Sequence, residues 1–509
     1  STSGSIAAGS FAAKVDFGTG AFPHFVSIGD LDGDGKPDLA VANSNSSSVS
    51  VIRNADLPPT ITSFSPSSGS VGSLVTITGT DLNNLTSVSI GGVSAIPISN
   101  NGTTLVAMVM PGATTGGVSV TTGGGTANGS GNFTVAAALA PNAQQGNKLV
   151  GTGGSSTANQ GYSVAVSADG NTAILGAPAD NSNQGAAWVY TRSGNTWTQQ
   201  GSKLVGTGAS GNARQGWSVA ISADGNTAIV GGILDNGGQG AVWVYTRSGS
   251  TWTQQGSKLV GTGNTGAAYQ GYSVAISADG NTAIVGGFLD NITQGAAWVY
   301  TRSGSTWAQQ GSKLVGTGNT GAAYQGNSVA VSADGNTAIV GGYADNSNQG
   351  AAWVYTRSGS TWTQQGSKLV GTGASGNAQQ GWSVVLSADG NTAIVGGNTD
   401  NSDQGAAWVF TRSGSTWTQQ GSKLVGTGAN GSAQQGRSVA LSADGTTAIV
   451  GGYEDNSNQG AVWVYTRSGS TWTQQGSKLV GTGANGNAQQ GFSVAISADA
   501  STSIVGGYT

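Results

Sequence analysis

The chain has 509 residues, of which 89 are glycine and only 8% carry a charge, about a third of the charged share in an average soluble domain. Its formal net charge is −4 and Lys and Arg do not cluster, which excludes the strongly basic surface typical of a nucleic-acid-binding protein. Cysteine is absent, which excludes disulfides and thiolate metal sites, and no apolar run approaches the ~18 residues of a membrane-spanning helix.

Residues 1–57 are expected to form a first β-rich unit. Runs rich in Val, Ile, Phe and Ala predict strands at 11–18, 24–32, 38–44 and 48–54. The chain opens at Ser1 without Met, which is typical of a processed, mature N-terminus.

An aspartate-rich loop separates the second and third of these strands. Its candidate ligands alternate along the loop: Asp30, Asp32, Asp34, the main-chain carbonyl of Lys36, and Asp38. Oxygen ligands at this spacing, with Gly35 at the sharp turn, are typical of a wrapped Ca²⁺ loop. An EF-hand needs Glu where this loop has Val41, and no helices flank the loop. The sequence therefore predicts one structural Ca²⁺ site, and the alternative is an acidic turn between strands.

This first unit resembles the VCBS-type FG-GAP repeat, through FVSIGDLDGDGKPDLAVAN followed by SVSVIRN. Residues 58–136 follow a Pro-Pro linker and show the short strands of an Ig-like sandwich. The SPSSG turn and the ITGTDL strand end resemble an IPT/TIG domain, and nearly the whole segment fits. That resemblance implies a spacer or interaction module of a surface protein, without a catalytic site.

A block of 55 residues then repeats along residues 141–509. Its marker, Gln-Gly-x-Ser-Val, begins at Gln160, Gln215, Gln270, Gln325, Gln380, Gln435 and Gln490. In the first block, strands are predicted at 163–167, 172–176, 186–190 and 196–204, with turn sequences between them. Four strands per unit, repeated radially, predict a seven-bladed β-propeller, so the whole chain is expected to be all-β.

The blades resemble FG-GAP repeats such as those of integrin α-subunit propellers. Gly161 to Ala165 stand where that family has FG-x-S-V-A, and Gly176, Ala177 and Pro178 spell its GAP motif. The long Asp-rich Ca²⁺ loop of that family is replaced here by SADGNT. A single carboxylate such as Asp169 makes no Ca²⁺ cage, so no metal is predicted in the blades.

Few side chains of the chain could act as a catalytic acid, base or nucleophile, because it has only one His (His24) and one Glu (Glu454). Carboxylates of the Asp169 and Asp180 types recur in every complete block, which favours structural turns over a unique active site. The repeated Arg192 and Lys148 types are expected to pair with them at the surface. The protein is therefore predicted not to be an enzyme. Two Trp per complete block recur at fixed positions, and packing between blades explains them better than sugar stacking.

Comparison of the blocks shows where they vary: after Gln-Gly and after the second strand. In an up-and-down blade these positions share one face, and many carry large apolar residues, which predicts an exposed interaction face. Its members are Tyr162, Trp217, Tyr272, Trp382, Phe492, Ile233, Leu234, Phe288, Tyr343 and Tyr453. The alternative explanation of this variation is that solvent-exposed loops are under little sequence constraint.

The seventh block lacks its third and fourth strands. Residues 144–150 (QQGNKLV) match the fourth-strand sequence QQGSKLV, which restores the fourth strand and leaves the third position empty. Either the natural chain continues beyond Thr509, or another subunit donates a strand into the gap. The nominated donor is the segment 5–17. Its apolar positions include Ile6, Phe11, Val15 and Phe17, and it begins at Ser5.

The sequence predicts an extracellular structural protein of the bacterial surface, secreted and assembled head to tail into a fibre by this strand donation. Its partner is then a second copy of itself. The alternative is an adhesin whose varied face binds glycan or a surface protein.

Overall fold

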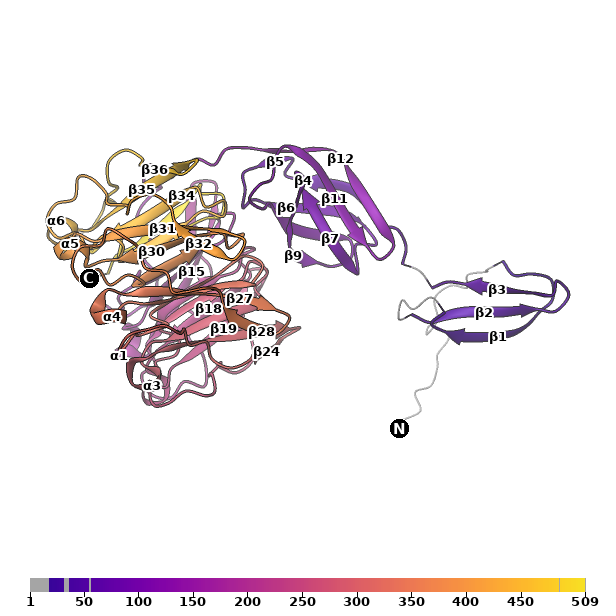
Figure 1. Ribbon diagram of the computed structural model, residues 1–509, viewed down its shortest axis with the longest axis horizontal. Coiled ribbons are helices and arrows are strands. Elements are labelled where there is room, and N and C mark those ends of the chain that lie inside the picture. Colours follow the sequence, from indigo (N-terminus) through magenta and orange to yellow (C-terminus); the bar gives the residue numbers. More distant parts are fainter. Residues whose placement is uncertain (1–17, 32–35, 55, 485, 509) are drawn as a thin grey trace.

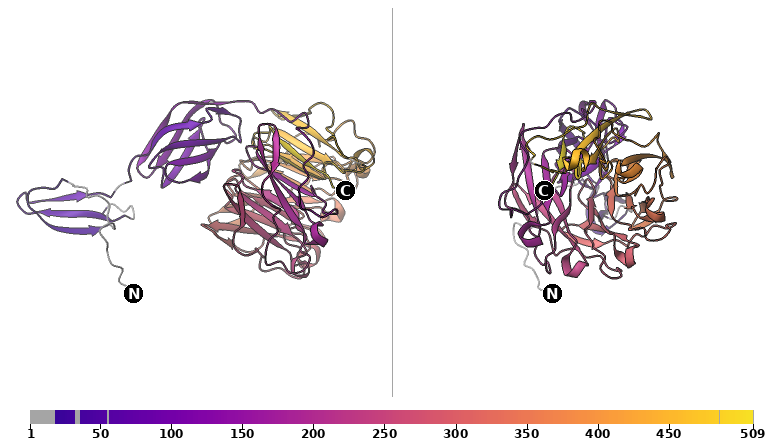
Figure 2. Two further views of the ribbon diagram at one scale, coloured as in Figure 1. Left: turned by 180° about the vertical axis from the view of Figure 1, so that it is seen from behind. Right: turned by 90° about the vertical axis from the view of Figure 1, so that its left-hand side faces the viewer.

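The computed structural model describes residues 18–31, 36–54, 56–484 and 486–508. Its elements are almost all strands, in three parts: a small N-terminal sheet, a two-sheet sandwich and a large ring of sheets (Figure 1). The sandwich lies between the other two parts, as the view from behind also shows (Figure 2). The all-β fold class is confirmed.

The N-terminal sheet has three strands in the order β1-β2-β3. They are β1 (Pro23–Gly29), β2 (Asp38–Asn43) and β3 (Ser48–Ile52). Residues 11–17 of the first predicted strand lie outside the described residues. Successive side chains of β1 point to opposite faces, yet Phe25, Val26 and Ile28 are all exposed. Neither face is therefore covered at β1 by the described part of the chain.

The sandwich packs two antiparallel sheets, ordered β4-β6-β10-β9 and β5-β12-β11-β7-β8, apart from one parallel pairing of β5 with β12. Its strands are β4 (Thr60–Ser65), β5 (Ser68–Gly69), β6 (Leu74–Thr80), β7 (Leu85–Ile90), β8 (Val93–Ser94), β9 (Ile96–Asn100), β10 (Thr104–Met108), β11 (Gly116–Thr122) and β12 (Gly125–Val135). Alternating residues of both sheets, such as Val75, Ile77 and Val120, form one core.

The ring consists of six four-stranded sheets and a two-stranded seventh sheet, each called a blade below. The first strands are β13 (Ser163–Val166), β17 (Gln215–Ile221), β21 (Ser273–Ile276), β25 (Ser328–Val331), β29 (Ser383–Leu386), β33 (Ser438–Leu441) and β37 (Ser493–Ile496). The second strands are β14 (Thr172–Ala177), β18 (Thr227–Gly232), β22 (Thr282–Gly287), β26 (Thr337–Gly342), β30 (Thr392–Gly397), β34 (Thr447–Gly452) and β38 (Ser503–Gly506). The third strands are β15 (Ala186–Ser193), β19 (Ala241–Ser248), β23 (Ala296–Ser303), β27 (Ala351–Ser358), β31 (Ala406–Ser413) and β35 (Ala461–Ser468). The fourth strands are β16 (Thr196–Gln199), β20 (Thr251–Gln254), β24 (Thr306–Gln309), β28 (Thr361–Gln364), β32 (Thr416–Gln419) and β36 (Thr471–Gln474).

A short turn links the second and third strands of each complete blade, and its central residues, such as Asn181 and Ser182, have left-handed φ values of 48° and 56°. These turns are α1 (Asp180–Asn183), α2 (Asp235–Gly238), α3 (Asp290–Thr293), α4 (Asp345–Asn348), α5 (Asp400–Asp403) and α6 (Asp455–Asn458). The fourth strands are shorter than predicted: β16 ends at Gln199, because Gly201 adopts a left-handed φ of 71° that turns the chain. Leu204 then forms only an isolated bridge with Ala187.

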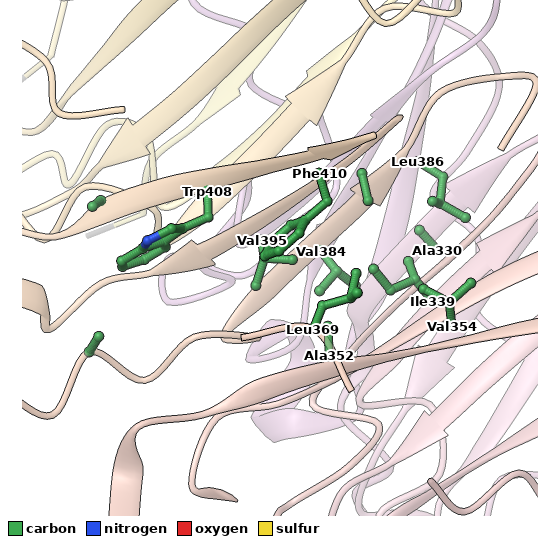
Figure 3. Packing of buried hydrophobic residues seen from close by; sticks show 13 residues of the cluster. Ala330, Ile339, Ala352, Val354, Leu369, Val384, Leu386, Val395, Trp408 and Phe410 are labelled. Carbon is green, nitrogen blue, oxygen red and sulfur yellow. The ribbon is translucent and has the colours of Figure 1, made fainter. Parts of the chain in front are cut away.

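Most of the core of the ring lies between neighbouring blades. Figure 3 shows Trp408 and Phe410 of the fifth blade together with Ile339 and Val354 of the fourth. Trp408 and its five counterparts in the third strands are fully buried. Packing between blades therefore explains this recurrent tryptophan, as predicted from the sequence.

The ring closes through alanines that the sequence analysis did not single out. The main-chain N–H of Ala168 bonds to the carbonyl of Ala223, and the same bond repeats around the ring at 2.9–3.1 Å until Ala498 donates to Ala168. Side chains of these alanines pack against Met108 and Met110 of the sandwich. The sandwich is thus docked on the face of the ring that carries the turns between the first and second strands, which read SADG in six blades and SADA in the seventh.

Gly72 lies at this junction, and it sets a first prediction. Its φ is +91°, and a Cβ there would lie 2.4 Å from the main-chain carbon of Ala498. Gly72→Val is therefore expected to undock the sandwich from the ring of blades. The main chain of Ala498 cannot move aside without breaking the hydrogen bonds that join the seven alanines. Small-angle X-ray scattering should show a larger maximum dimension than for Gly112→Val, where φ is +90° but the nearest atom is 3.6 Å away. Equal dimensions for the two variants would contradict this prediction.

Candidate functional site

The predicted Ca²⁺ loop is described only at its ends. Asp38 is 1% exposed, and its two carboxylate oxygens accept the main-chain N–H groups of Leu31 (3.0 Å) and Asn54 (2.8 Å). Nζ of Lys36 pairs with Oδ1 of Asp56 at 2.5 Å. Asp32 and Asp34 lie outside the described residues. Asp38 thus links the start of the loop to the residues that follow β3, and the Ca²⁺ site stays a prediction.

Asp32→Ala tests that site. We expect isothermal titration calorimetry of the intact chain to detect one tight Ca²⁺ site, and we expect the variant to lose it, because the loop gives up one of its four carboxylates. Asp169→Ala, in a turn of the first blade, is the matched control and should keep the site. More than one tight site, or unchanged binding in Asp32→Ala, would contradict the prediction.

The aspartates of the blades have structural roles. Oδ1 of Asp169 accepts the hydroxyl of Ser167 and the N–H of Asn171, which fixes the turn between the first two strands. Asp180 is fully buried and pairs with Lys203 at 2.5 Å. Burial acts against its ionised form, but the hydrogen bonds from Lys203 and Ser155 outweigh this effect and lower the pKa of Asp180.

Two details of the predicted pairing need correction. The sequence analysis placed the pairs of these carboxylates with Arg and Lys at the surface, whereas the Asp180-type carboxylate is buried and its partner is the lysine. The arginine counterpart, Arg192, instead lies over the ring of Trp197, 5.5 Å from its centroid, and donates to Asn171.

The varied positions come together, as predicted, at one mouth of the ring. Tyr162 packs on Trp217 (4.7 Å between centroids) and on Phe492 (4.9 Å), and Tyr343 packs on Trp382 (4.8 Å). Tyr272 with Phe288, and Tyr453 with Phe492, continue the series. Tyr269, Tyr324 and Tyr508, which sequence reasoning missed, pack in the same series. These three residues and the aromatic members of the predicted face are called the aromatic cluster below.

The prediction of an exposed patch needs correction here. Ile233 and Phe492 are buried, and Leu234 and the other predicted members are half-buried, because they pack on one another across the mouth. Burial raises the pKa of Tyr343 and Tyr453 to about 12. Whether this face contacts a partner stays a prediction.

Arg437 occupies the aromatic position of the sixth blade. Its guanidinium carbon lies 4.0 Å from the ring centroid of Phe492, 5.0 Å from that of Trp382 and 5.7 Å from that of Tyr453. Within the described residues its guanidinium has no side-chain acceptor, and the indole N–H of Trp382 is buried without a partner. These donors among aromatic faces suit an anionic group attached to a flat or cyclic ligand.

The seventh blade has an open edge. β38 pairs with β37 on one side, and no third strand lies on its other side within the described residues. Val505 of β38 is 37% exposed, whereas its six counterparts are at most 5% exposed. An interior position of this kind offers unpaired main-chain groups to another strand.

Residues 144–150 lie at the far side of this gap, as predicted. The main-chain N–H of Thr482 bonds to Oε1 of Gln144 (2.5 Å), and the indole of Trp197 bonds to Oε1 of Gln145 (3.1 Å). In the complete blades these two contacts are made by the pair of glutamines at the end of the fourth strand, such as Gln199 and Gln200. Residues 144–150 thus make the glutamine contacts of a fourth strand, although they form no ladder. The nominated donor residues Ser5, Ile6, Phe11, Val15 and Phe17 lie outside the described residues.

Comparison with known families supports the reading of the first two parts. Residues 59–135 match the IPT/TIG domain, and residues 22–52 match the FG-GAP repeat. The chain carries an FG-GAP repeat and an IPT/TIG domain. The resemblances stated from the sequence for residues 1–57 and 58–136 are confirmed, whereas neither match extends into the blades; such domains are typical of extracellular structural or binding proteins.

Other comparisons add less. No curated protein matches this chain. Among solved structures, it is similar to the crystal structure of a Bacteroides uniformis protein assigned as a 6-phosphogluconolactonase, at 13% identity and a TM-score of 0.43. That similarity covers 63% of this chain and 85% of the other. Among the described residues, the helices are too short and too polar to cross a membrane.

Proposed function

We propose that this protein is a non-enzymatic subunit of a fibre on the bacterial surface. In this proposal, a strand from one copy inserts at the open edge of β38 in the next copy, and repetition builds a head-to-tail filament. The observation that carries it is the unpaired interior edge at Val505, between β38 and residues 144–150. One structural Ca²⁺ in the loop 30–38 belongs to the same proposal.

The arrangement of the parts supports an intermolecular exchange. The IPT/TIG domain is docked on the ring and lies between the ring and the FG-GAP repeat (Figure 1). A strand that precedes the FG-GAP repeat therefore starts on the far side of the docked domain from the open edge. A neighbouring copy has no such constraint, since its N-terminal strand can approach from outside.

Two variants test the assembly, one at each end of the contact. Deletion of residues 1–15 should leave folded monomers, because the donor is lost. Val505→Lys should do the same at the acceptor edge, because a charge in the gap opposes strand insertion. Val49→Lys, at an exposed valine of β3, is the matched control and should still assemble. Filaments of the truncated chain in sedimentation velocity would overturn the donor assignment.

A second function is favoured by the position of Arg437 in the aromatic cluster. Aromatic faces stack on sugars, and a guanidinium beside them binds a carboxylate, so an adhesin that recognises acidic glycan is the alternative. A polyuronate should then quench tryptophan fluorescence while neutral dextran does not, and Arg437→Gln should abolish the difference. Equal responses of the original chain to the two polymers would remove this alternative.

A further inference from the structure

Two buried asparagines stand at the mouth of the ring, at positions where most blades carry an aromatic or aliphatic side chain. By the 55-residue period, Asn327 is the counterpart of Trp382. By the same period, Asn398 is the counterpart of Tyr453. Asn327 is 6% exposed and Asn398 is 4% exposed. Burial of an amide costs free energy unless its polar atoms are hydrogen-bonded, so the partners of these two side chains are informative.

Each asparagine uses its NH₂ group and leaves its oxygen unpaired. Nδ2 of Asn327 donates to the main-chain carbonyl of Trp382 at 2.8 Å. Nδ2 of Asn398 donates to Oε1 of Gln434, also at 2.8 Å. Both Oδ1 atoms are buried and accept no hydrogen bond from any residue that the structure describes. Because an amide carries its oxygen and its nitrogen on opposite sides of one carbon, each oxygen faces away from the bond that its nitrogen makes.

The unpaired donors of the mouth lie beside these acceptors. Trp382 directly precedes β29 and Asn398 directly follows β30, and because these two strands pair antiparallel, the two residues are neighbours. Arg437 stands in the next blade, with its guanidinium carbon 5.0 Å from the ring centroid of Trp382. Asn327 stands in the preceding blade and contacts Trp382 through its amide. The fourth to sixth blades therefore bring together unpaired donors and unpaired acceptors.

Aromatic side chains border this group of polar atoms. Tyr343 packs on Trp382 with 4.8 Å between the ring centroids, and the ring centroid of Tyr453 lies 5.7 Å from the guanidinium carbon of Arg437. Aromatic rings pack against the C–H groups of a sugar, a guanidinium binds a carboxylate, and an amide oxygen accepts a hydroxyl. Together these groups match a sugar ring that carries one carboxylate and several hydroxyls.

We propose that these residues form a binding site for a single uronic acid unit. The guanidinium of Arg437 and the indole N–H of Trp382 bind its carboxylate, and the oxygens of the two asparagines each accept one of its hydroxyls. This inference rests on the second function proposed above, the recognition of an acidic glycan, and deepens it by naming the sugar unit and the residues that bind its hydroxyls. A neutral sugar leaves the guanidinium unpaired, and a carboxylic acid without hydroxyls leaves both amide oxygens unpaired, so each binds more weakly.

Isothermal titration calorimetry of the intact chain with three small ligands tests the site. Methyl β-D-glucuronide has both the carboxylate and the hydroxyls. Methyl β-D-glucoside lacks the carboxylate, and cyclohexanecarboxylate keeps a six-membered ring and a carboxylate but has no hydroxyl. We expect saturable 1:1 binding of the glucuronide. The other two ligands should each bind at least about tenfold more weakly, the effect of leaving a buried polar group unpaired.

Two variants assign the roles of the residues. Asn327→Ala should reduce the preference for the glucuronide over cyclohexanecarboxylate, because only the glucuronide has a hydroxyl for Oδ1. Arg437→Gln should weaken the binding of both acids. Asn336→Ala is the matched control, because Asn336 is an exposed asparagine of the same blade as Asn327, in the turn at the opposite face, and bonds to Asp334. This control should bind all three ligands as the original chain does.

The outcomes separate this inference from the function on which it rests. Equal binding of the glucuronide and cyclohexanecarboxylate, both lost in Arg437→Gln, would overturn the inference and leave acidic-glycan recognition standing. Binding of a polyuronate without binding of the glucuronide would do the same. An unchanged preference in Asn327→Ala would overturn the assigned role of the amide oxygens. Absence of binding by every acidic ligand would overturn both the inference and the acidic-glycan function.

Discussion

Trp298→Ala is expected to destabilise the ring by about 3–5 kcal/mol, the usual effect of deleting a buried Trp. Its side chain is fully buried in the cluster between the second and third blades, with Val242 and Val285 as neighbours. The indole of Trp298 lies against Gly261, and its N–H bonds to the carbonyl of Thr262 at 2.8 Å. The substitution therefore leaves a cavity between two blades and an unpaired carbonyl.

Trp307→Ala in the same blade is the matched control. Trp307 is half-buried, lies 5.4 Å from the guanidinium of Arg302 and bonds to Gln255. We expect a loss of about 1–2 kcal/mol, because one hydrogen bond and one cation–π contact disappear without a closed cavity. Urea denaturation followed by far-UV circular dichroism measures both values. Similar midpoints for the two variants would contradict this reading of the core.

Lys258→Met is expected to cost about 2–4 kcal/mol, because it leaves a buried carboxylate without its cation. Asp235 is 1% exposed and pairs with Lys258 at 2.5 Å, while the lysine itself is about one-fifth exposed, which screens part of the interaction. The remaining N–H of Ser210 still bonds to Asp235, and this limits the loss.

Lys148→Met is the matched control for that change. It replaces the same residue type at the same position of the repeat, but Lys148 is exposed and makes no ion pair within the described residues. Its effect should stay within about 0.5 kcal/mol. A loss in Lys148→Met equal to that in Lys258→Met would contradict the pairing.

The periodic features of the fold could be predicted from the sequence. Turn residues at fixed offsets and short runs rich in Val, Ile and Trp gave four strands per block, and the structure confirms the repeating four-stranded sheets. The early end of β16 could not be predicted, because it depends on the left-handed conformation of Gly201.

Contacts that form only when the blades close into a ring could not be predicted from the sequence. Ala168 recurs without change in all seven blocks, which is a signal, but its role appears only where seven alanines meet on one axis. The partner of Asp180 could not be chosen either, since Lys203 and Arg192 recur with the same period. The aromatic positions were found from their variation, whereas their mutual burial depends on the width of the mouth.

Electron micrographs of the intact purified chain test fibre assembly by strand insertion. We expect filaments of uniform width that lengthen with protein concentration, and monomers only when residues 1–15 are deleted. A chain that remains monomeric at high concentration, with Val505 and the edge of β38 still open, would contradict it.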